Sequence, residues 1–427
     1  MLPLVLAAAL LGQALTPEES ARLFDVALDL SEEDGGELWG RELFGPMLLL
    51  DARAGRMFAN EPDPGGRLAE SGVVFTGPLP AEIGLSNSAQ DWSGAHWTTL
   101  VAPFPRETAE LRRLLAHELF HRIQPELGLV AASPPNPHLD TLEGRTWLRL
   151  EWRALAAALS EEGEAQGRAL EDALLFREHR RSLFPEAAES EDGLERNEGL
   201  AESTGWRCSG LSAPEAARAI ADRLLAEESG DAFGRSFAYV SGPAWAALLD
   251  QGPDPAWRLA LLGAGASRPG LAALVATARG VSPDAREVDA RAANYGLEAV
   301  RADERARDER RREEIAGWRR RFVDGPVLAI RELEGMNYTF DPLDVRTFPE
   351  HGQVYPAIVI SAPWGKLTVD SGGALFVMEG STTREVRVAA PRGPEAAREG
   401  DGWRLELSQG WTLERGQRVG DWLVVRG

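Results

Sequence analysis

The sequence predicts an α+β protein with a small mixed sheet, a mainly helical part and a closing all-β domain. Three observations predict this class. Short apolar runs between turn residues fill positions 45–104, which is typical of strands. Apolar residues recur at helical spacing from position 105 to about position 321. From Gly325 the pattern changes to short strands separated by Gly, Pro and Asp, and 427 residues suffice for two or three domains.

The composition is that of a folded protein with an acidic surface. Hydrophobic residues make up 44% of the chain, and the formal net charge is -21. Phosphate groups would repel such a chain, so we expect no nucleic-acid partner and no anionic membrane surface as partner. The charge is more simply explained by solubility than by a preference for basic substrates.

The N-terminal segment 1–14 is predicted to be a secretory signal peptide. Its apolar run from Leu2 to Leu11 is too short to span a bilayer, which takes about 20 apolar residues. Gly12 and Ala14 are the small residues at the -3 and -1 positions of a cleavage site after Ala14. The alternative is a buried first helix, because no Lys or Arg precedes the run. We expect an exported protein, periplasmic or extracellular, without an integral membrane segment in the mature chain.

Residues 15–104 form the first predicted part, an N-terminal α/β region. A helix covers roughly Pro17 to Leu30. Apolar and β-branched residues bounded by turns then mark the strands. The strands are GPMLLLDA from Gly45, RMFAN from Arg56, SGVVFTG from Ser71 and HWTTLVAPF from His96.

Residues 105–323 form the second, mainly helical part. Pro105 opens a helix that carries leucines at helical spacing. An amphipathic helix from Leu139 is followed by a returning helix, GRALEDALLFREHRRSLFP. The acidic stretch PEAAESEDG is predicted to be a loop leading into LERNEGLAESTG. The last helix begins at Ser282 and Pro283, a good cap and first-turn pair.

Residues 324–427 form the third part, a small C-terminal β domain. Its predicted strands are short and end at Gly, Pro or Asp. They are GPVLAIREL, YPAIVISA, GKLTVD, GALFVME, REVRVAAP, WRLELS and DWLVVRG.

Residues 117–121 read His-Glu-Leu-Phe-His inside a predicted helix. Histidines four positions apart project from one helix face, so both imidazoles can bind one ion. A hydrolytic zinc site needs three protein ligands and an open position for water. The pattern therefore offers His117 and His121 as ligands of one Zn²⁺ and the adjacent Glu118 as the general base that deprotonates the water. The alternative is a pair of core histidines without a metal.

The third ligand must come from elsewhere in the chain. The metzincin pattern would need glycine and histidine where Gln124 and Leu127 stand, so that subclass is excluded. Downstream carboxylates and His138 remain. Glu143 and Glu151 are candidates because their helix follows the histidine helix closely.

The segment HELFH followed by RNEGLAESTG resembles the gluzincin metallopeptidases, which include thermolysin and the zinc aminopeptidases. The resemblance covers roughly residues 97–250 and implies a zincin-like catalytic domain. It also implies that Glu198, in the Asn-Glu-Gly segment, is the third zinc ligand. Glu202 lies four residues on and would orient a ligand histidine by accepting its other N–H.

Gluzincins also resemble one another in a later tyrosine that stabilises the oxyanion. The aminopeptidase pattern is Tyr-x-x-Gly before a helix, and FAYVSGPAWAALLD supplies Tyr239 and Gly242, with Pro243 starting the helix. Tyr295 is the alternative. The resemblance further implies an edge strand within NSAQDWSGAHWTTLVAPF that pairs with an extended substrate, with His96 near the cleft.

Two features depart from the family pattern. His121 and Glu198 are 77 residues apart, further than in the best-known members, which we explain by an inserted helical hairpin over about residues 139–184. The Gly-x-Met-Glu-Asn segment that captures a substrate's amino group in the aminopeptidases is missing from the sequence. Exopeptidase action is therefore not predicted.

The expected function is hydrolysis of peptide bonds by an exported metallopeptidase with one zinc ion and a peptide or protein substrate. Glu118 and Tyr239 would be catalytic, and His117, His121 and Glu198 would hold the metal. The alternative is a catalytically inactive zincin-scaffold binding protein of the cell envelope, whose β domain docks glycan or protein. The intact Glu118 argues against that alternative, because a binding protein needs no general base.

Overall fold

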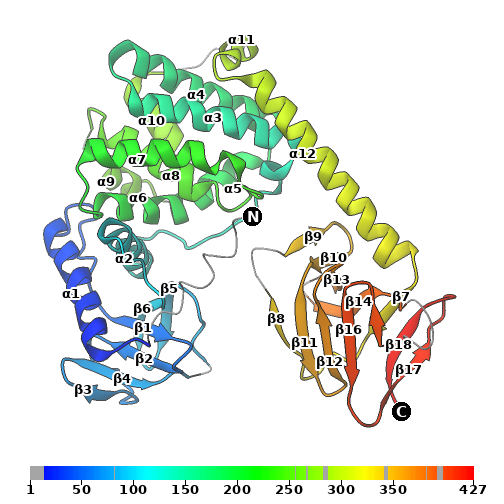
Figure 1. Ribbon diagram of the computed structural model, residues 1–427. Coiled ribbons are helices and arrows are strands. Elements are labelled where there is room, and N and C mark those ends of the chain that lie inside the picture. The colour runs from blue at the N-terminus through cyan, green and yellow to red at the C-terminus, as the bar shows by residue number, and fades with distance from the viewer. Residues whose placement is uncertain are drawn as a thin grey trace. The chain divides into compact units, whose positions relative to one another are not determined.

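The computed structural model in Figure 1 describes residues 14–80, 82–254, 256–265, 268–281, 287–340, 345–380, 382–391 and 398–427. The chain divides into two compact units, Met1–Glu304 and Arg305–Gly427. The first combines a sheet with many helices and the second is built mainly of strands, so the predicted α+β class is confirmed. Apart from Ala14, the predicted signal segment lies outside the described residues. No described helix is both long enough and apolar enough to cross a membrane.

The first unit opens with helix α1 and a mixed sheet whose strand order is β3-β4-β2-β1-β6-β5. Strands β1 and β6 are parallel, and β5 is an end strand of the sheet. Successive side chains of a strand point to opposite faces. Leu49 and Leu100 accordingly join the core beneath the helices, whereas Leu48 and Trp97 belong to a second cluster on the other face. The bounds are α1 Pro17–Asp34, β1 Met47–Asp51, β2 Arg56–Ala59, β3 Ala69–Ser71, β4 Val74–Pro78, β5 Ser88–Trp92 and β6 Ala95–Val101.

Helices make up the rest of the first unit. Helix α3 packs along α4 as a hairpin, α2 lies beside α6, and α6 lies beside α8 (Figure 1). The bounds are α2 Thr108–Ile123, α3 Leu142–Ser160, α4 Gly163–Leu183, α5 Ala187–Leu194, α6 Leu200–Arg207, α7 Ala213–Ala226, α8 Ala238–Asp250, α9 Trp257–Gly263, α10 Leu271–Arg279, α11 Val288–Ala293 and α12 Leu297–Trp318. A π-helical turn, Glu195–Gly199, joins α5 to α6.

Two expectations for this part need correction. The acidic stretch predicted to be a loop forms helix α5, because Ala187, Glu191 and Leu194 share a buried face and arginines neutralise Glu191. Helix α2 begins at Thr108 and not at Pro105, because the Glu107 side chain accepts hydrogen bonds from the first free backbone N–H groups. The helix start predicted at Ser282 and Pro283 lies outside the described residues.

The second unit is a β-sandwich. Its described strands form two sheets, ordered β17-β18-β7-β14-β13-β10-β9 and β15-β16-β12-β11-β8. Phe376 and Val386 of the first sheet share one core with Leu367 and Leu405 of the second. The bounds are β7 Val327–Ile330, β8 Asn337–Phe340, β9 Arg346–Phe348, β10 Gly352–Tyr355, β11 Ile358–Ala362, β12 Gly365–Val369, β13 Ala374–Glu379, β14 Thr382–Ala389, β15 Glu399–Gly400, β16 Trp403–Leu407, β17 Trp411–Arg415 and β18 Trp422–Arg426.

The boundary between the two units falls inside α12, between Glu304 and Arg305. The sequence had predicted this boundary after the helix, at residue 324. The reason is that Ile315 and Trp318, near the end of α12, pack with Phe322 against Phe348 and Leu375 of the sandwich. The end of this helix therefore belongs with the β domain.

Candidate metal centre

Helix α2 presents the two histidines of the HELFH segment. Every residue from Leu115 to Phe120 is buried, so this part of the helix is enclosed by the core. His117 and Glu118 are buried and His121 is half-buried. The helical repeat places both imidazoles on one side of α2, facing the turn that joins α5 to α6.

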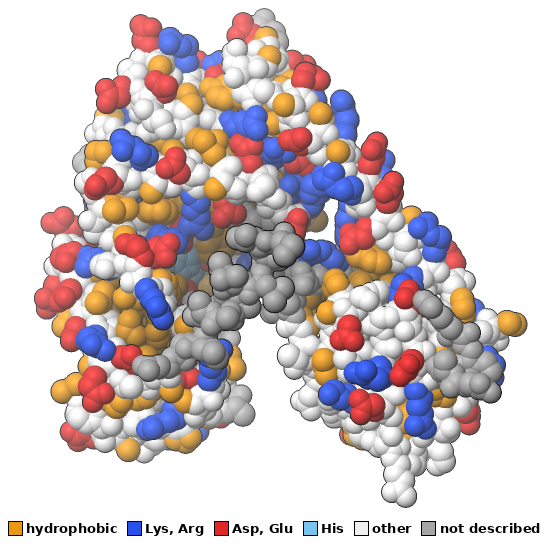
Figure 2. Space-filling model, viewed as in Figure 1, with side chains coloured by type: hydrophobic (Ala, Val, Ile, Leu, Met, Phe, Trp, Pro, Cys, Tyr) orange, Lys and Arg blue, Asp and Glu red, His pale blue; other side chains and the backbone are white. Residues whose placement is uncertain are grey.

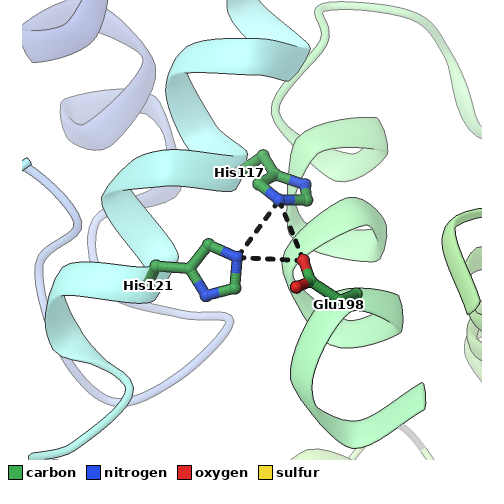
Figure 3. A group of neighbouring side chains, drawn as sticks. All are labelled: His117, His121 and Glu198. Atoms are coloured by element: carbon green, nitrogen blue, oxygen red, sulfur yellow. Dashed lines mark hydrogen bonds and ion pairs between the residues drawn. The ribbon is translucent and has the colours of Figure 1, made fainter. Parts of the chain in front are cut away.

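Glu198 approaches the histidines from the π-helical turn Glu195–Gly199. Figure 3 shows both rings and the Glu198 carboxylate pointing toward one another from two separate helical segments. Short π-helical insertions are frequent at functional sites. Here the π-helical turn carries the carboxylate that faces the two imidazoles.

The donor atoms of these three residues fit a single small cation. His117 Nε2 and His121 Nε2 are 3.1 Å apart, and Glu198 Oε2 lies 3.6 Å from the first and 3.3 Å from the second. A tetrahedral zinc ion with bonds of about 2.0–2.2 Å separates its ligand atoms by about 3.3–3.6 Å. One imidazole pair and one carboxylate are also a common ligand set of catalytic zinc. The three side chains could therefore hold one zinc-sized ion.

Glu202 binds the ring nitrogen of His117 that does not face His121 and Glu198. His117 Nδ1 donates to Glu202 Oε2 at 3.0 Å. The other oxygen of Glu202 accepts from Arg113 and from Arg223, the latter at 2.5 Å. Burial opposes ionisation, but the bond with His117 and the two guanidinium groups prevail and lower the pKa of Glu202 to about 2. An ionised Glu202 can only accept, so the proton of a neutral His117 stays on Nδ1 and Nε2 is free to bind a metal.

Gln124 orients His121 in the same way, by accepting a hydrogen bond from Nδ1. His121 Nδ1 donates to Gln124 Oε1 at 2.8 Å, and Gln124 Nε2 donates to Asn197 Oδ1 at 2.9 Å. Both amide side chains are buried. This chain of hydrogen bonds ties the end of α2 to the residue before Glu198. In the sequence, Gln124 served only to exclude the metzincin pattern, although an amide one turn after the second histidine could have indicated an orienting role.

The electrostatics of the centre favour a positive charge among the three proposed ligands and leave one oxygen of Glu118 free. Burial opposes a charge on His117, but its hydrogen bonds with the Glu198 and Glu202 carboxylates prevail and raise its pKa to about 10. The space between the two Nε2 atoms and Glu198 Oε2 therefore favours positive charge, which either a proton or a metal ion can supply. Glu118 is 5% exposed, and its buried Oε2 has no hydrogen-bond partner among the described residues. Burial raises the pKa of Glu118, while the two histidines act in the opposite direction. A buried carboxylate with a free oxygen is suited to accept a proton from water.

Tyr239 lies against His117. The two rings stack with centroids 5.7 Å apart and an interplanar angle of 6°. Burial and the neighbouring Glu198 carboxylate raise the pKa of Tyr239, so its hydroxyl remains a donor.

The helix that carries Tyr239 starts differently from the prediction. Helix α8 begins at Ala238, so Pro243 lies inside it and does not start it. The first turn is formed by hydrogen bonds such as Ser241 N–H to Phe237 O at 2.7 Å, which do not need the N–H group that proline lacks.

Two glycines bring Tyr239 to the centre. A Cβ atom on Gly242 would lie 2.3 Å from the Cα of Gly199, and one on Gly199 would lie 2.9 Å from the Cα of Gly242. The turn carrying Glu198 and helix α8 therefore cross backbone to backbone. The glycine of Asn-Glu-Gly and the glycine of Tyr-x-x-Gly are required by the same contact.

Gly242→Ala is therefore expected to force the two segments apart. Overpacking of this kind costs about 1–3 kcal/mol of unfolding free energy. Gly167→Ala in α4 is a matched control, because its Cβ would meet nothing within 4 Å. That variant should be unchanged or more stable by up to about 1 kcal/mol. Urea unfolding measures both, and wild-type stability of the Gly242 variant would contradict the close crossing.

The other candidate residues lie in separate interactions. Glu151 bonds to Arg177 and Arg180, and Glu143 accepts from the Trp147 indole N–H. Among the described residues, the group able to hold a metal is His117, His121 and Glu198. The remaining candidates are also paired elsewhere: His138 with Glu191, Tyr295 with Asp172, and His96 with Asp91.

Comparison of the chain with protein-family models, curated proteins and solved structures finds no match. The function of the chain is therefore inferred from the geometry of the centre and from the sequence motifs within it.

Proposed function

We propose that this protein is a one-zinc metallopeptidase of gluzincin type, with a zincin-like catalytic domain, that hydrolyses peptide bonds. The observation that carries the proposal is the convergence of His117 Nε2, His121 Nε2 and Glu198 Oε2 within 3.1–3.6 Å of one another, next to a buried carboxylate with a free oxygen. A structural zinc site would close its fourth position with a protein ligand and would not need Glu118.

Each residue of the centre has one task in this proposal. Zinc held by the three ligands would acidify a water molecule and polarise the scissile carbonyl. Glu118, whose basicity is increased by burial, accepts the proton of the water and passes it to the leaving amine. The Tyr239 hydroxyl donates to the carbonyl oxygen as negative charge develops. Glu202 keeps the His117 proton on Nδ1.

The sheet offers a place for the substrate backbone. Strand β5 is an end strand of its sheet, and helix α2 packs against both β5 and β6. An end strand carries backbone N–H and C=O groups that an extended peptide can pair with. We propose that the substrate adds to β5 as a further strand, which would direct its carbonyl groups past α2.

A metal and activity measurement tests the proposal. Protein purified without chelator and supplied with zinc is expected to contain about one zinc per chain by elemental analysis and to cleave casein or members of a peptide library. Chelator should abolish cleavage and lower the melting temperature, because metal binding stabilises the folded state. A chain that binds no zinc would contradict the proposal. Bound zinc without cleavage of any peptide would favour a zincin-scaffold binding protein.

A further inference from the structure

A cavity opens beside Tyr239, next to the candidate metal centre. Its volume is about 340 Å³, and it is lined by residues at the end of α7 and just after it, in the segment before α8 and in the first turn of α8, among them Arg223, Glu227, Arg235, Ser236 and Tyr239. Tyr239 thus faces both His117 and this cavity. A substrate group in the cavity would adjoin the bond that the centre is proposed to cleave.

Two arginines give the cavity a cationic wall. The Arg235 side chain is 69% exposed, and one of its guanidinium nitrogens lies 3.4 Å from Glu198 Oε1. Arg223 is less exposed and bonds to Glu202, with Glu227 4.0 Å away. Glu227 is the acidic residue in the cavity lining. Two guanidinium groups therefore face one carboxylate there.

The carboxylates next to these arginines have other cationic partners. Glu202 is shared with Arg113 and His117, and the Glu198 oxygen that faces the histidines would be engaged by a metal. Arg235 contacts Glu198 Oε1 through one guanidinium nitrogen at 3.4 Å and also interacts with the Tyr239 hydroxyl, so its remaining N–H groups are left for a ligand. This local excess of positive charge stands out in a chain of net charge -21, over whose surface acidic and basic side chains are interspersed in the view of Figure 2.

We propose that this cavity is a substrate subsite that binds a carboxylate, with Arg235 as its main contact. The inference depends on the proposed peptidase function and assigns its substrate class. The preferred peptides would carry an acidic side chain near the scissile bond, or a free C-terminal carboxylate. The planar guanidinium fork is suited to hold either group through paired hydrogen bonds.

A role confined to orienting Glu198 is the competing explanation for Arg235. In that case, loss of Arg235 would weaken zinc binding and lower turnover of all substrates by the same factor. In the proposed role, its loss changes the preference among substrates and leaves the zinc content unchanged. Comparison of matched peptides separates the two explanations.

The experiment uses quenched fluorescent peptides in which one position at a time is Glu, Gln or Lys, each as the C-terminal amide and as the free acid. At one position, or for the free acids, we expect kcat/KM to favour the carboxylate by about tenfold or more, as one charge-assisted hydrogen bond would provide. Arg235→Gln should remove this preference, and Arg235→Glu should turn it toward Lys. Arg168→Gln, on the exposed side of α4, should leave it unchanged.

A binding measurement keeps the inference testable apart from catalysis. The zinc-loaded Glu118→Gln protein should bind the preferred carboxylate peptide at least tenfold more tightly than its neutral counterpart, and Arg235→Gln in that background should equalise the two. Equal rates and equal affinities for both peptides in the wild-type protein and its Glu118→Gln variant would overturn the subsite. Absence of any hydrolysis, by contrast, would count against the peptidase function, and the affinity ratio would still decide the subsite.

Discussion

Glu118→Gln is expected to lower kcat by about a hundredfold to ten-thousandfold while the protein keeps one zinc per chain. The substitution preserves the shape of the side chain and removes its ability to accept a proton. Glu118 is buried on α2 beside two proposed ligands without being one of them, so the metal should stay bound. Peptide turnover and elemental analysis of the same preparation measure both parts of the prediction.

Glu110→Gln is the matched control for this variant. Glu110 is exposed in the first turn of the same helix, so its replacement should leave both kcat and zinc content at wild-type values. Full turnover by the Glu118 variant would remove Glu118 as the base and with it the proposed mechanism. Loss of zinc from that variant would show instead that Glu118 contributes to metal binding.

Arg177→Met is expected to lower the unfolding free energy by about 3–5 kcal/mol, because it leaves buried carboxylates without their partner. Arg177 on α4 bonds to Glu151 of α3 and to Glu195 at the start of the π-helical turn, the latter at 2.6 Å. All three side chains are 0–2% exposed. Arg180 bonds to Glu151 as well, so the remaining arginine cannot neutralise both carboxylates.

The same substitution should weaken zinc binding, because Glu195 lies one turn before Glu198 and anchors the segment that carries it. Urea unfolding and zinc titration of Arg177→Met measure the two effects. Arg168→Met is the control: this side chain is 66% exposed and pairs with Glu164 across one helical turn, so the loss should stay within about 0.5 kcal/mol. Unfolding of Arg177→Met at the wild-type urea concentration would contradict the structural importance of the buried pairs.

Much of the fold could be predicted because its signals are local. Leu48 and Leu49 belong to one apolar run, and the run forms a strand buried on both faces. Leucines at helical spacing likewise predicted α2. The prediction of a loop for the acidic stretch that forms α5 was wrong. Its helix depends on Arg180 and Arg181, which neutralise Glu191 from a neighbouring helix. A local pattern does not reveal such partners.

Part of the candidate site could likewise be predicted from local sequence, and part could not. The spacing of His117 and His121 places two imidazoles on one helix face through the helical repeat alone. Glu198 was nominated by resemblance, whereas Glu143 and Glu151 could not be separated from it by spacing. The structure separates them, because Glu151 is bonded to two arginines and Glu198 faces the histidines.

By itself, the sequence determined the elements and the side-chain chemistry: a helix with two imidazoles and a carboxylate, and a later Asn-Glu-Gly segment. The tertiary structure alone decided which distant groups meet. It paired Gln124 with His121, brought Arg113 and Arg223 to Glu202, and set Gly199 against Gly242. The physical reason is range, because helical periodicity acts over a few residues, whereas these contacts depend on how whole helices pack.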